Sequence, residues 1–270
     1  MIGAEGDKDK NAFVRLINPL GEENSVMRTT LLPGLVEALA RNFNRSAAAC
    51  RLFEIGNTFR DYINEEGLPA EGLSLCAGVY GEGADFFFLK GCTEKLFQKL
   101  GLGAPIFEPA RDVPTFHPGR CAYVSGADEE VYGVIGELHP DAAERFGIGE
   151  RVCCLEFDYD MLVRAADTNR VYAQLPKYPA VLRDIALLAD DDVPTGRLLE
   201  IIRQRGGRIL ETAELFDVYR GRQVPDGKKS LAFGLVFRDS ERTLTDEDAG
   251  KAMKKILKGL EEEAGAVLRE

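Results

Sequence analysis

Residues 182–207 read LRDIALLADDDVPTGRLLEIIRQRGG, and this stretch decides the fold of the second half of the chain. Its beginning, LRDIALLAD, is an apolar run that stops at aspartates, a pattern typical of a strand. A helix is predicted next, because Pro194 suits a first helical turn and Gly206-Gly207 suits a helix end. The side chains predicted to face the core are Leu198, Ile201 and Ile202.

The residues that follow complete a β-α-β-β-α-β order. ILETAELFDVY and KKSLAFGLVFRD predict two strands on either side of a loop that contains the turn sequence Pro225-Asp226-Gly227. TLTDEDAGKAMKKILKGLEEEAG predicts a second helix that Thr245 and Asp248 open as a capping box, and AVLRE supplies a last strand. The order predicts a ferredoxin-like fold, in which four antiparallel strands carry both helices on one face.

The first 165 residues predict a separate α+β domain dominated by antiparallel hairpins. LLPGLVEALARNFNR has apolar residues at helical spacing, and a second helix runs from Asp85, its N-cap, to Leu100. The side chains predicted to share one face of that second helix are Leu89, Cys92, Leu96 and Leu100. Strands are predicted at RLFEIGNTFRD, LSLCAGVYG, CAYVSGA, VYGVIGEL and VCCLEFDYDML.

The sequence therefore predicts a domain at 1–165, a linker at 166–177 and a ferredoxin-like domain at 178–270. The length of 270 residues favours two domains. The acidic charge is uneven: of 34 Lys and Arg and 45 Asp and Glu, residues 171–270 hold 17 and 18. The net charge of −11 thus belongs to the first domain, and the second is nearly neutral.

Several classes of protein are excluded by what the chain lacks. It has no apolar run of the length that a membrane helix needs and no secretory signal pattern, so we expect a cytoplasmic protein. No phosphate-binding loop, dinucleotide fingerprint, zinc-protease motif or nucleophile elbow is present. We therefore predict no catalytic, cofactor-binding or metal-ligating residue in this segment.

The cysteines and histidines suit structural roles. The six cysteines form no Cys-x-x-Cys pair, and most lie in apolar runs, as reduced core thiols do. His117 and His139 each precede a proline, so a turn-shaping imidazole is favoured over a proton shuttle.

Clustered cations make the second domain a candidate for binding nucleic acid. The candidate phosphate-binding residues are Arg183, Arg220, Arg222, Lys228, Lys229 and Arg238. A weaker candidate is a lysine stripe on the last helix, which is also what a solvated amphipathic face looks like. The stripe consists of Lys251, Lys254, Lys255 and Lys258.

The strand KKSLAFGLVFRD offers a small, flat outer face rather than a stacking surface. Its large residues Leu231, Phe233, Leu235 and Phe237 alternate inward, which leaves Ser230, Ala232, Gly234, Val236 and Arg238 outward. It matches the aromatic run of an RNA-recognition motif only in part, because Ser230 and Leu231 stand where that motif has Gly and an aromatic residue. Base stacking in that mode is therefore not predicted.

An ordered set of motifs resembles one family over nearly the whole chain. NPLGEENSVMRTTLLPGLVEALARN, RLFEIGNTF, FHPGR and GELHP resemble the catalytic-like module of bacterial phenylalanine-tRNA ligase β subunits. YPAVLRDIALL, LFDVYRG, GKKSLAF and TLTDED resemble the ferredoxin-fold anticodon-binding domain that ends the same subunit.

The resemblance implies a part of a class II synthetase-like antiparallel sheet domain that has lost catalysis. ATP, with magnesium, and phenylalanine would be handled by a separate α subunit, in a heterotetramer of two α and two β chains that charges the tRNA for phenylalanine. RLFEIGNTFR stands at the class II motif with an Arg-x-Glu signature, but Arg51 precedes Glu54 by three residues. GVIGELHP lacks the arginine of the third class II motif. The β subunit's upstream domains would precede Asn11, and Met1 would be an internal start.

Two alternatives remain beside this interpretation. The first is a free-standing ferredoxin-like module that binds RNA or senses a ligand, because that fold serves many functions. The second is an autonomous class II-like enzyme, which would need a pair of ATP-clamping arginines. Neither accounts for the ordered motifs.

Overall fold

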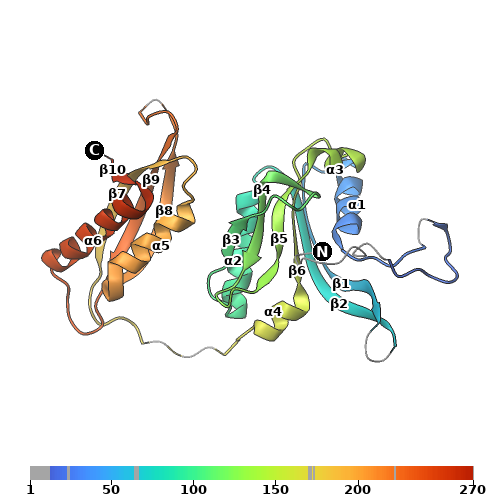
Figure 1. Cartoon of the computed structure of the whole chain (residues 1–270), viewed down its shortest axis with the longest axis horizontal. Helices are drawn as coiled ribbons and strands as arrows, with labels where there is room; N and C mark the ends of the chain where they lie inside the picture. Colours follow the sequence, from blue (N-terminus) through green and yellow to red (C-terminus); the bar gives the residue numbers. More distant parts are fainter. Residues whose placement is uncertain are drawn as a thin grey trace. The chain divides into compact units, whose positions relative to one another are not determined.

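The computed structural model describes residues 13–22, 25–63, 67–169, 172, 174–221 and 223–269, without the side chains of 61–63. The chain divides into two compact units, residues 1–170 and 171–270 (Figure 1). Each unit has its own sheet and its own core, so each is described by itself.

A six-stranded antiparallel sheet forms the centre of the first unit, in the order β1-β2-β6-β5-β4-β3. Its strands are β1 (Ala49–Ile63), β2 (Pro69–Gly81), β3 (Ile106–Pro109), β4 (Phe116–Ser125), β5 (Val131–Leu138) and β6 (Cys153–Asp158). The predicted hairpins are confirmed, since β1 pairs with β2 and β4 with β5. The short strand β3 is one that the sequence did not predict.

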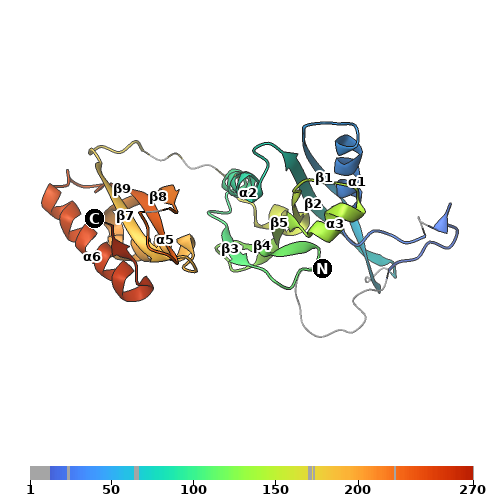
Figure 2. The same ribbon diagram turned by 90° about the horizontal axis from the view of Figure 1, so that it is seen from above.

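Helices cover both faces of this sheet (Figure 2). They are α1 (Leu32–Phe43), α2 (Phe86–Leu100), α3 (Pro140–Arg145) and α4 (Tyr159–Ala165). One core cluster joins α1 and the residues around α3 to one face, and a second joins α2 and α4 to the other. Gly78 lets α1 approach β2 closely, because a Cβ there would lie 2.7 Å from Leu39 Cδ1.

Two helices of the first unit differ from the prediction. In α2 the Asp85 cap is confirmed by a 2.8 Å bond from the Phe88 N–H, but the buried residues are Leu89, Thr93 and Phe97. A row of residues four apart therefore faces the sheet, and Cys92 is exposed. The predicted strand VCCLEFDYDML ends at Asp158, whose side chain accepts from the Met161 N–H and starts α4.

The second unit has the predicted ferredoxin-like fold. Its antiparallel sheet has the order β10-β7-β9-β8. The strands are β7 (Val181–Asp190), β8 (Leu210–Tyr219), β9 (Lys228–Phe237) and β10 (Val267–Leu268), and the helices are α5 (Thr195–Gly206) and α6 (Asp246–Ala264). Both helices pack on one face, over buried Leu231, Phe233, Leu235 and Phe237. The other face of the sheet carries no helix of the described residues.

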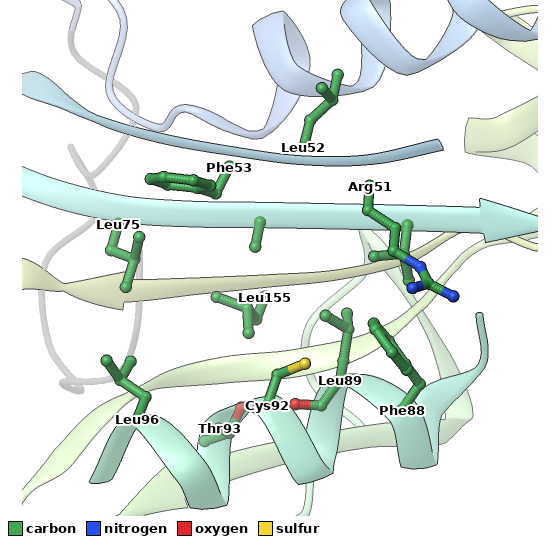
Figure 3. Close-up of a pocket in the computed structure, with 12 residues that line it drawn as sticks. Arg51, Leu52, Phe53, Leu75, Phe88, Leu89, Cys92, Thr93, Leu96 and Leu155 are labelled. Atoms are coloured by element: carbon green, nitrogen blue, oxygen red, sulfur yellow. Dashed lines mark hydrogen bonds between the residues drawn. The ribbon is translucent and has the colours of Figure 1, made fainter. Parts of the chain in front are cut away.

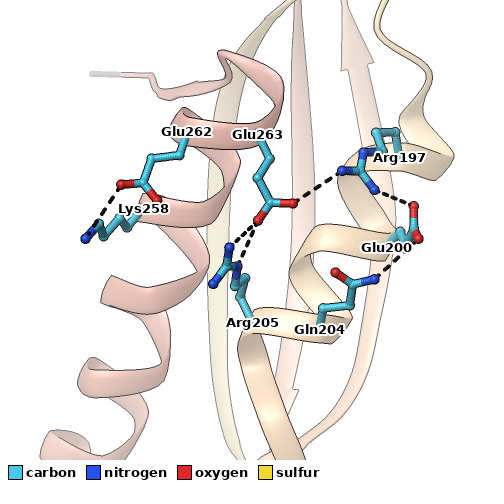
Figure 4. A network of polar contacts seen from close by, with 7 residues as sticks. All are labelled: Arg197, Glu200, Gln204, Arg205, Lys258, Glu262 and Glu263. Carbon is cyan, nitrogen blue, oxygen red and sulfur yellow. Dashed lines mark hydrogen bonds and ion pairs between the residues drawn. The ribbon is translucent and has the colours of Figure 1, made fainter.

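The ends and the mutual packing of α5 and α6 follow from named contacts. Thr245 Oγ1 accepts from the Asp248 N–H at 3.2 Å, and Asp248 accepts from the Thr245 N–H at 3.0 Å, which confirms the capping box. The Glu263 carboxylate on α6 pairs with two arginines of α5, Arg197 at 3.3 Å and Arg205 at 2.5 Å (Figure 4). Gly259 makes room for Arg205, since a Cβ there would lie 2.7 Å from its Cγ.

Candidate nucleic-acid interface

The helix-free face of the second sheet, called the open face below, has small side chains on its central strand β9. The flanking strands β7 and β8 add larger side chains to it, including the carboxylates of Asp184, Glu214 and Asp217. Ala232, Gly234 and Val236 of β9 point toward it, as the alternation predicted. Leu182 of β7 lies opposite Val236 across the strand pair and is 67% exposed. The small side chains of β9 give a flat partner access to the middle of the sheet.

Phe216 supplies an aromatic ring on this face. It is the extra residue of a bulge in β8, since Leu215 pairs with Phe233 and Asp217 with the adjacent Ala232. Its side chain is 62% exposed, and a Cβ on Gly234 would lie 3.8 Å from its ring. As predicted, β9 offers no stacking residue on this face, but the neighbouring strand β8 supplies one. A glycine floor beside an exposed ring suits an unpaired nucleobase.

Arg269 and Tyr219 form a second part of the open face. The Arg269 guanidinium lies 5.6 Å from the centre of the Tyr219 ring and donates to Ser230 Oγ at 3.1 Å. These two side chains cover Ser230, which lies on the open face as predicted but is only 4% exposed. No carboxylate of the described residues lies within ion-pair distance of Arg269, so its charge is free to meet a phosphate.

The six predicted phosphate-binding residues do not form one cluster. Arg183 and Arg238 lie where β7 begins and β9 ends, whereas Arg220, Lys228 and Lys229 lie at the opposite end of these strands. Arg222 lies outside the described residues.

Arg183 and Arg238 both have carboxylate partners within the unit. Arg183 approaches Asp246 Oδ1, in the first turn of α6, at 2.5 Å. Arg238 bonds Glu211 at 2.8 Å and also donates to the Tyr178 carbonyl oxygen. These contacts tie the start of α6, the start of β8 and the segment before β7 to the sheet.

The cations of the hairpin loop face an acidic turn. Arg220 Nε lies 3.1 Å from Asp191 Oδ1, and Lys228 Nζ lies 2.7 Å from Asp190 Oδ1. Both pairs are solvent-accessible, and exposed pairs of this kind contribute about 0–1 kcal/mol each. A phosphate can therefore replace either carboxylate at small cost.

Lys229 has a structural position that the sequence did not reveal. It is 6% exposed, and its ammonium donates to the carbonyl oxygens of Asp191 at 2.9 Å and Val193 at 2.7 Å. Burial, and then the nearby charge of Arg220, lower the pKa of Lys229. Its inward register on β9 aims the side chain at the turn and leaves it unsuited to contact a phosphate at the surface.

The lysine stripe lies on the exposed side of α6, away from the sheet, and therefore on a different surface from the open face. Lys251 and Lys258 pair with Glu247 at 2.8 Å and Glu262 at 3.6 Å, one turn away on the same helix. Such pairs are what a solvated helix face forms.

In the first unit, the polar residues of the quoted motifs bind one another. Arg28 pairs with Glu54 at 2.7 Å, and the Arg51 guanidinium stacks 4.3 Å from the ring centre of Phe88. Arg120 of FHPGR pairs with Glu137 of GELHP at 2.7 Å. Arg51 and Glu54, which the resemblance to class II enzymes singled out, are thus engaged within the chain.

His139 shapes a turn, as predicted, whereas His117 lies inside β4, where the pairing with β5 is interrupted. His117 Nδ1 accepts from the Gly119 N–H at 3.1 Å, and His139 Nδ1 accepts from the Asp141 N–H at 3.3 Å to cap α3. Four of the cysteines are buried thiols: Cys76, Cys121, Cys153 and Cys154. Burial raises the pKa of Cys121 to about 11 and of Cys153 to about 12, so these thiols stay protonated.

An apolar groove lies between α2 and the strands β1 and β2 of the first unit (Figure 3). Phe53 and Leu75 line its strand side, and Leu89, Cys92 and Leu96 line its helix side. The groove contains no pair of polar groups that could activate a substrate. Within the described ranges there is also no cluster of three or more side chains able to hold a metal ion, and no helix long and apolar enough to cross a bilayer.

Comparison with known families agrees with this division into two units. Residues 2–159 match the phenylalanyl tRNA synthetase beta chain CLM domain, and residues 176–269 match the ferredoxin-fold anticodon binding domain. The chain belongs to the phenylalanine-tRNA ligase β subunit family. The resemblance identified from the quoted motifs is therefore confirmed, as is the ferredoxin-like fold.

Relatives to which the chain is similar are β subunits of a ligase. The chain is 43% identical over 263 residues to the phenylalanine-tRNA ligase beta subunit of Clostridium tetani, which covers 97% of this chain and 33% of that protein. It is 38% identical over 279 residues to the corresponding subunit of Carboxydothermus hydrogenoformans, covering 99% and 34%. The chain thus spans about one third of the length of these relatives, and corresponds to a segment of a ligase subunit.

Proposed function

We propose that the second unit binds the anticodon region of the tRNA for phenylalanine through its open face. The observation that carries this proposal is the exposed ring of Phe216 beside Gly234, with Arg269 on the same face and without a carboxylate partner among the described residues. The ring provides stacking for a base, and the guanidinium provides a contact for a phosphate. Arg220 and Lys228 at one end of the sheet, and Arg183 and Arg238 at the other, are secondary candidates, and Arg222 is a candidate from the sequence alone.

The first unit serves in this proposal as a non-catalytic scaffold that pairs with the catalytic α subunit. Its motif residues Arg51 and Glu54 are engaged with Phe88 and Arg28, which supports a role other than ATP binding. The holoenzyme would contain two α and two β chains, act in the cytoplasm and use ATP and magnesium to attach phenylalanine to tRNA. This segment would hold neither cofactor.

The test is co-purification of the chain with a bacterial phenylalanine-tRNA ligase α subunit, followed by a salt titration of tRNA binding. Stable association, with tRNA affinity that falls as salt rises, is the expected result. Binding of RNA by the second unit without any association with the α subunit would instead support a free-standing RNA-binding module. ATP turnover by this chain alone would contradict the scaffold role.

A further inference from the structure

The turn between β7 and α5 places three consecutive carboxylates, Asp190, Asp191 and Asp192, against the loop between β8 and β9. This acidic turn faces the three loop cations whose positions the structure describes, Arg220, Lys228 and Lys229. The formal charges of the turn and of these cations cancel. A neutral surface of this kind attracts phosphate weakly, although its cations are the residues that a phosphate would contact.

The contacts between the turn and the loop are of two kinds. The first kind is buried or made by the backbone: Lys229 bonds two carbonyl oxygens of the turn, and the Asp191 N–H donates to the Gly227 carbonyl at 2.9 Å. These bonds hold the turn beside the loop whether or not RNA is bound. The carboxylates therefore stay at high local concentration around the loop cations.

The second kind of contact is exposed and exchangeable. The side chains of Arg220 and Asp191 are 60% and 47% exposed, and those of Lys228 and Asp190 are 35% and 54% exposed. Each guanidinium or ammonium can leave its carboxylate for a phosphate oxygen by rotating its side chain, without any movement of the backbone. The carboxylates are thus competitors of phosphate for the same two cations.

We propose that the acidic turn is an autoinhibitory element, whose Asp190 and Asp191 carboxylates occupy Lys228 and Arg220 until an RNA phosphate displaces them. This inference rests on the proposed binding of RNA by the second unit. Its consequence is that binding at this end of the sheet is weakened, so that a ligand which also engages the open face is favoured over a bare polyanion. The turn would then increase the specificity for RNA that also contacts the open face.

The test measures the affinity of the full chain for the tRNA for phenylalanine at low salt, with Asp190→Asn and Asp191→Asn. Each substitution is expected to tighten binding about two- to five-fold, the range that an exposed ion pair allows. Asp226→Asn is the matched control, because Asp226 lies in the same loop and its side chain has no partner among the described residues. It should leave the affinity within about a factor of 1.5 of the parent value.

A double substitution separates competition from a general effect of charge. The gain from Asp190→Asn should vanish when Lys228→Ala is added, since Lys228 is the cation that Asp190 occupies. An equal gain from Asp226→Asn, or a gain that survives Lys228→Ala, would overturn the proposal. Unchanged affinity in both turn variants, with normal tRNA binding by the parent chain, would also overturn it. Absence of binding by the parent chain would instead refute the proposed function on which it rests.

Discussion

The two sheets of the molecule differ in how many of their faces are covered. The six-stranded sheet of the first unit has helices on both faces, and its polar motif residues pair with one another. The four-stranded sheet of the second unit has helices on one face, and its other face exposes Leu182, Phe216 and Tyr219. The same antiparallel architecture thus gives a sheet buried on both faces in one unit and a sheet with one face open to a partner in the other.

The largest expected effect contrasts a glycine from each sheet. A Cβ on Gly133 would lie 2.1 Å from the Glu156 carbonyl oxygen, so Gly133→Ala should destabilise the first unit by about 3 kcal/mol. A Cβ on Gly234 would find its nearest atom 3.7 Å away, so Gly234→Ala should change stability by less than about 0.5 kcal/mol. Urea unfolding, followed by hydrogen exchange in each unit, measures both. Equal losses of stability in the two variants would contradict the difference in packing between the two sheets.

Glu156 tests how the covered face is held together. Its carboxylate accepts from the Leu31 N–H at 2.7 Å and from Thr30 Oγ1, which fixes the start of α1. Glu156→Gln should therefore cost the first unit about 2 kcal/mol. The affinity for tRNA should stay unchanged. Glu144→Gln, at an exposed position on α3, is the control, and the account fails here if both variants unfold at the same urea concentration.

Phe216 tests the open face directly. Phe216→Ala should weaken tRNA binding about tenfold, because stacking on an exposed ring contributes about 1–3 kcal/mol per base. The free energy of unfolding of the Phe216→Ala variant should hardly change, since Phe216 is 62% exposed. Phe87→Ala is the matched control, with a ring that is 74% exposed on the first unit. A similar loss of affinity in both variants would mean that the open face is not the binding surface.

Arg269 tests the electrostatic part of the same face. Arg269→Ala should reduce the slope of log affinity against log salt by about one, because one phosphate contact is lost. Arg203→Ala, an exposed arginine on α5, should leave the slope unchanged. The measurement is a salt titration of tRNA binding with both variants, and an unchanged slope for Arg269→Ala would argue against this contact.

The smallest effect concerns the helix that lies away from the open face. Thr245→Ala removes the N-cap of α6 and should lower stability by about 1 kcal/mol, whereas exposed Thr243→Ala should not.

Arg242 and then Thr245 hold the pKa of Asp248 well below its usual range. Because the folded-state pKa of Asp248 is depressed, its contribution to the free energy of unfolding is complete above its unfolded-state pKa. That contribution is lost as pH falls through the folded-state pKa. Asp248→Asn should flatten this acid limb in urea unfolding, and a change in tRNA affinity would contradict the account.

The sequence predicted the elements that periodicity and capping define. The strand alternation of β9, the Gly206-Gly207 end of α5 and the Thr245 capping box need only neighbouring residues, and all are present. α4 was missed, because the apolar run that precedes Asp158 continues into Tyr159–Ala165. Only the bond from the Met161 N–H shows where the strand stops.

The candidate site was less accessible to sequence reasoning, because charge along the chain does not show pairing in space. Lys229 is adjacent to Lys228, yet its register aims it into the interior and Lys228 outward. The alternation that turns Ala213 and Leu215 inward also turns Phe216 outward, but the bulge that leaves Phe216 unpaired cannot be read from the sequence. Arg269 joins the open face only through the pairing of β10 with β7, a contact between distant parts of the sequence. A possible signal was the large apolar residue among acidic neighbours in AELFDVY.

Ultraviolet cross-linking of the full chain to the tRNA for phenylalanine, with the attachment sites mapped by mass spectrometry, tests the central contrast most directly. Attachment is expected at Phe216 and Tyr219 on the open face, with loss of the first of these in Phe216→Ala. Cross-links confined to the first unit, or to the outer sides of α5 and α6, would contradict this expectation.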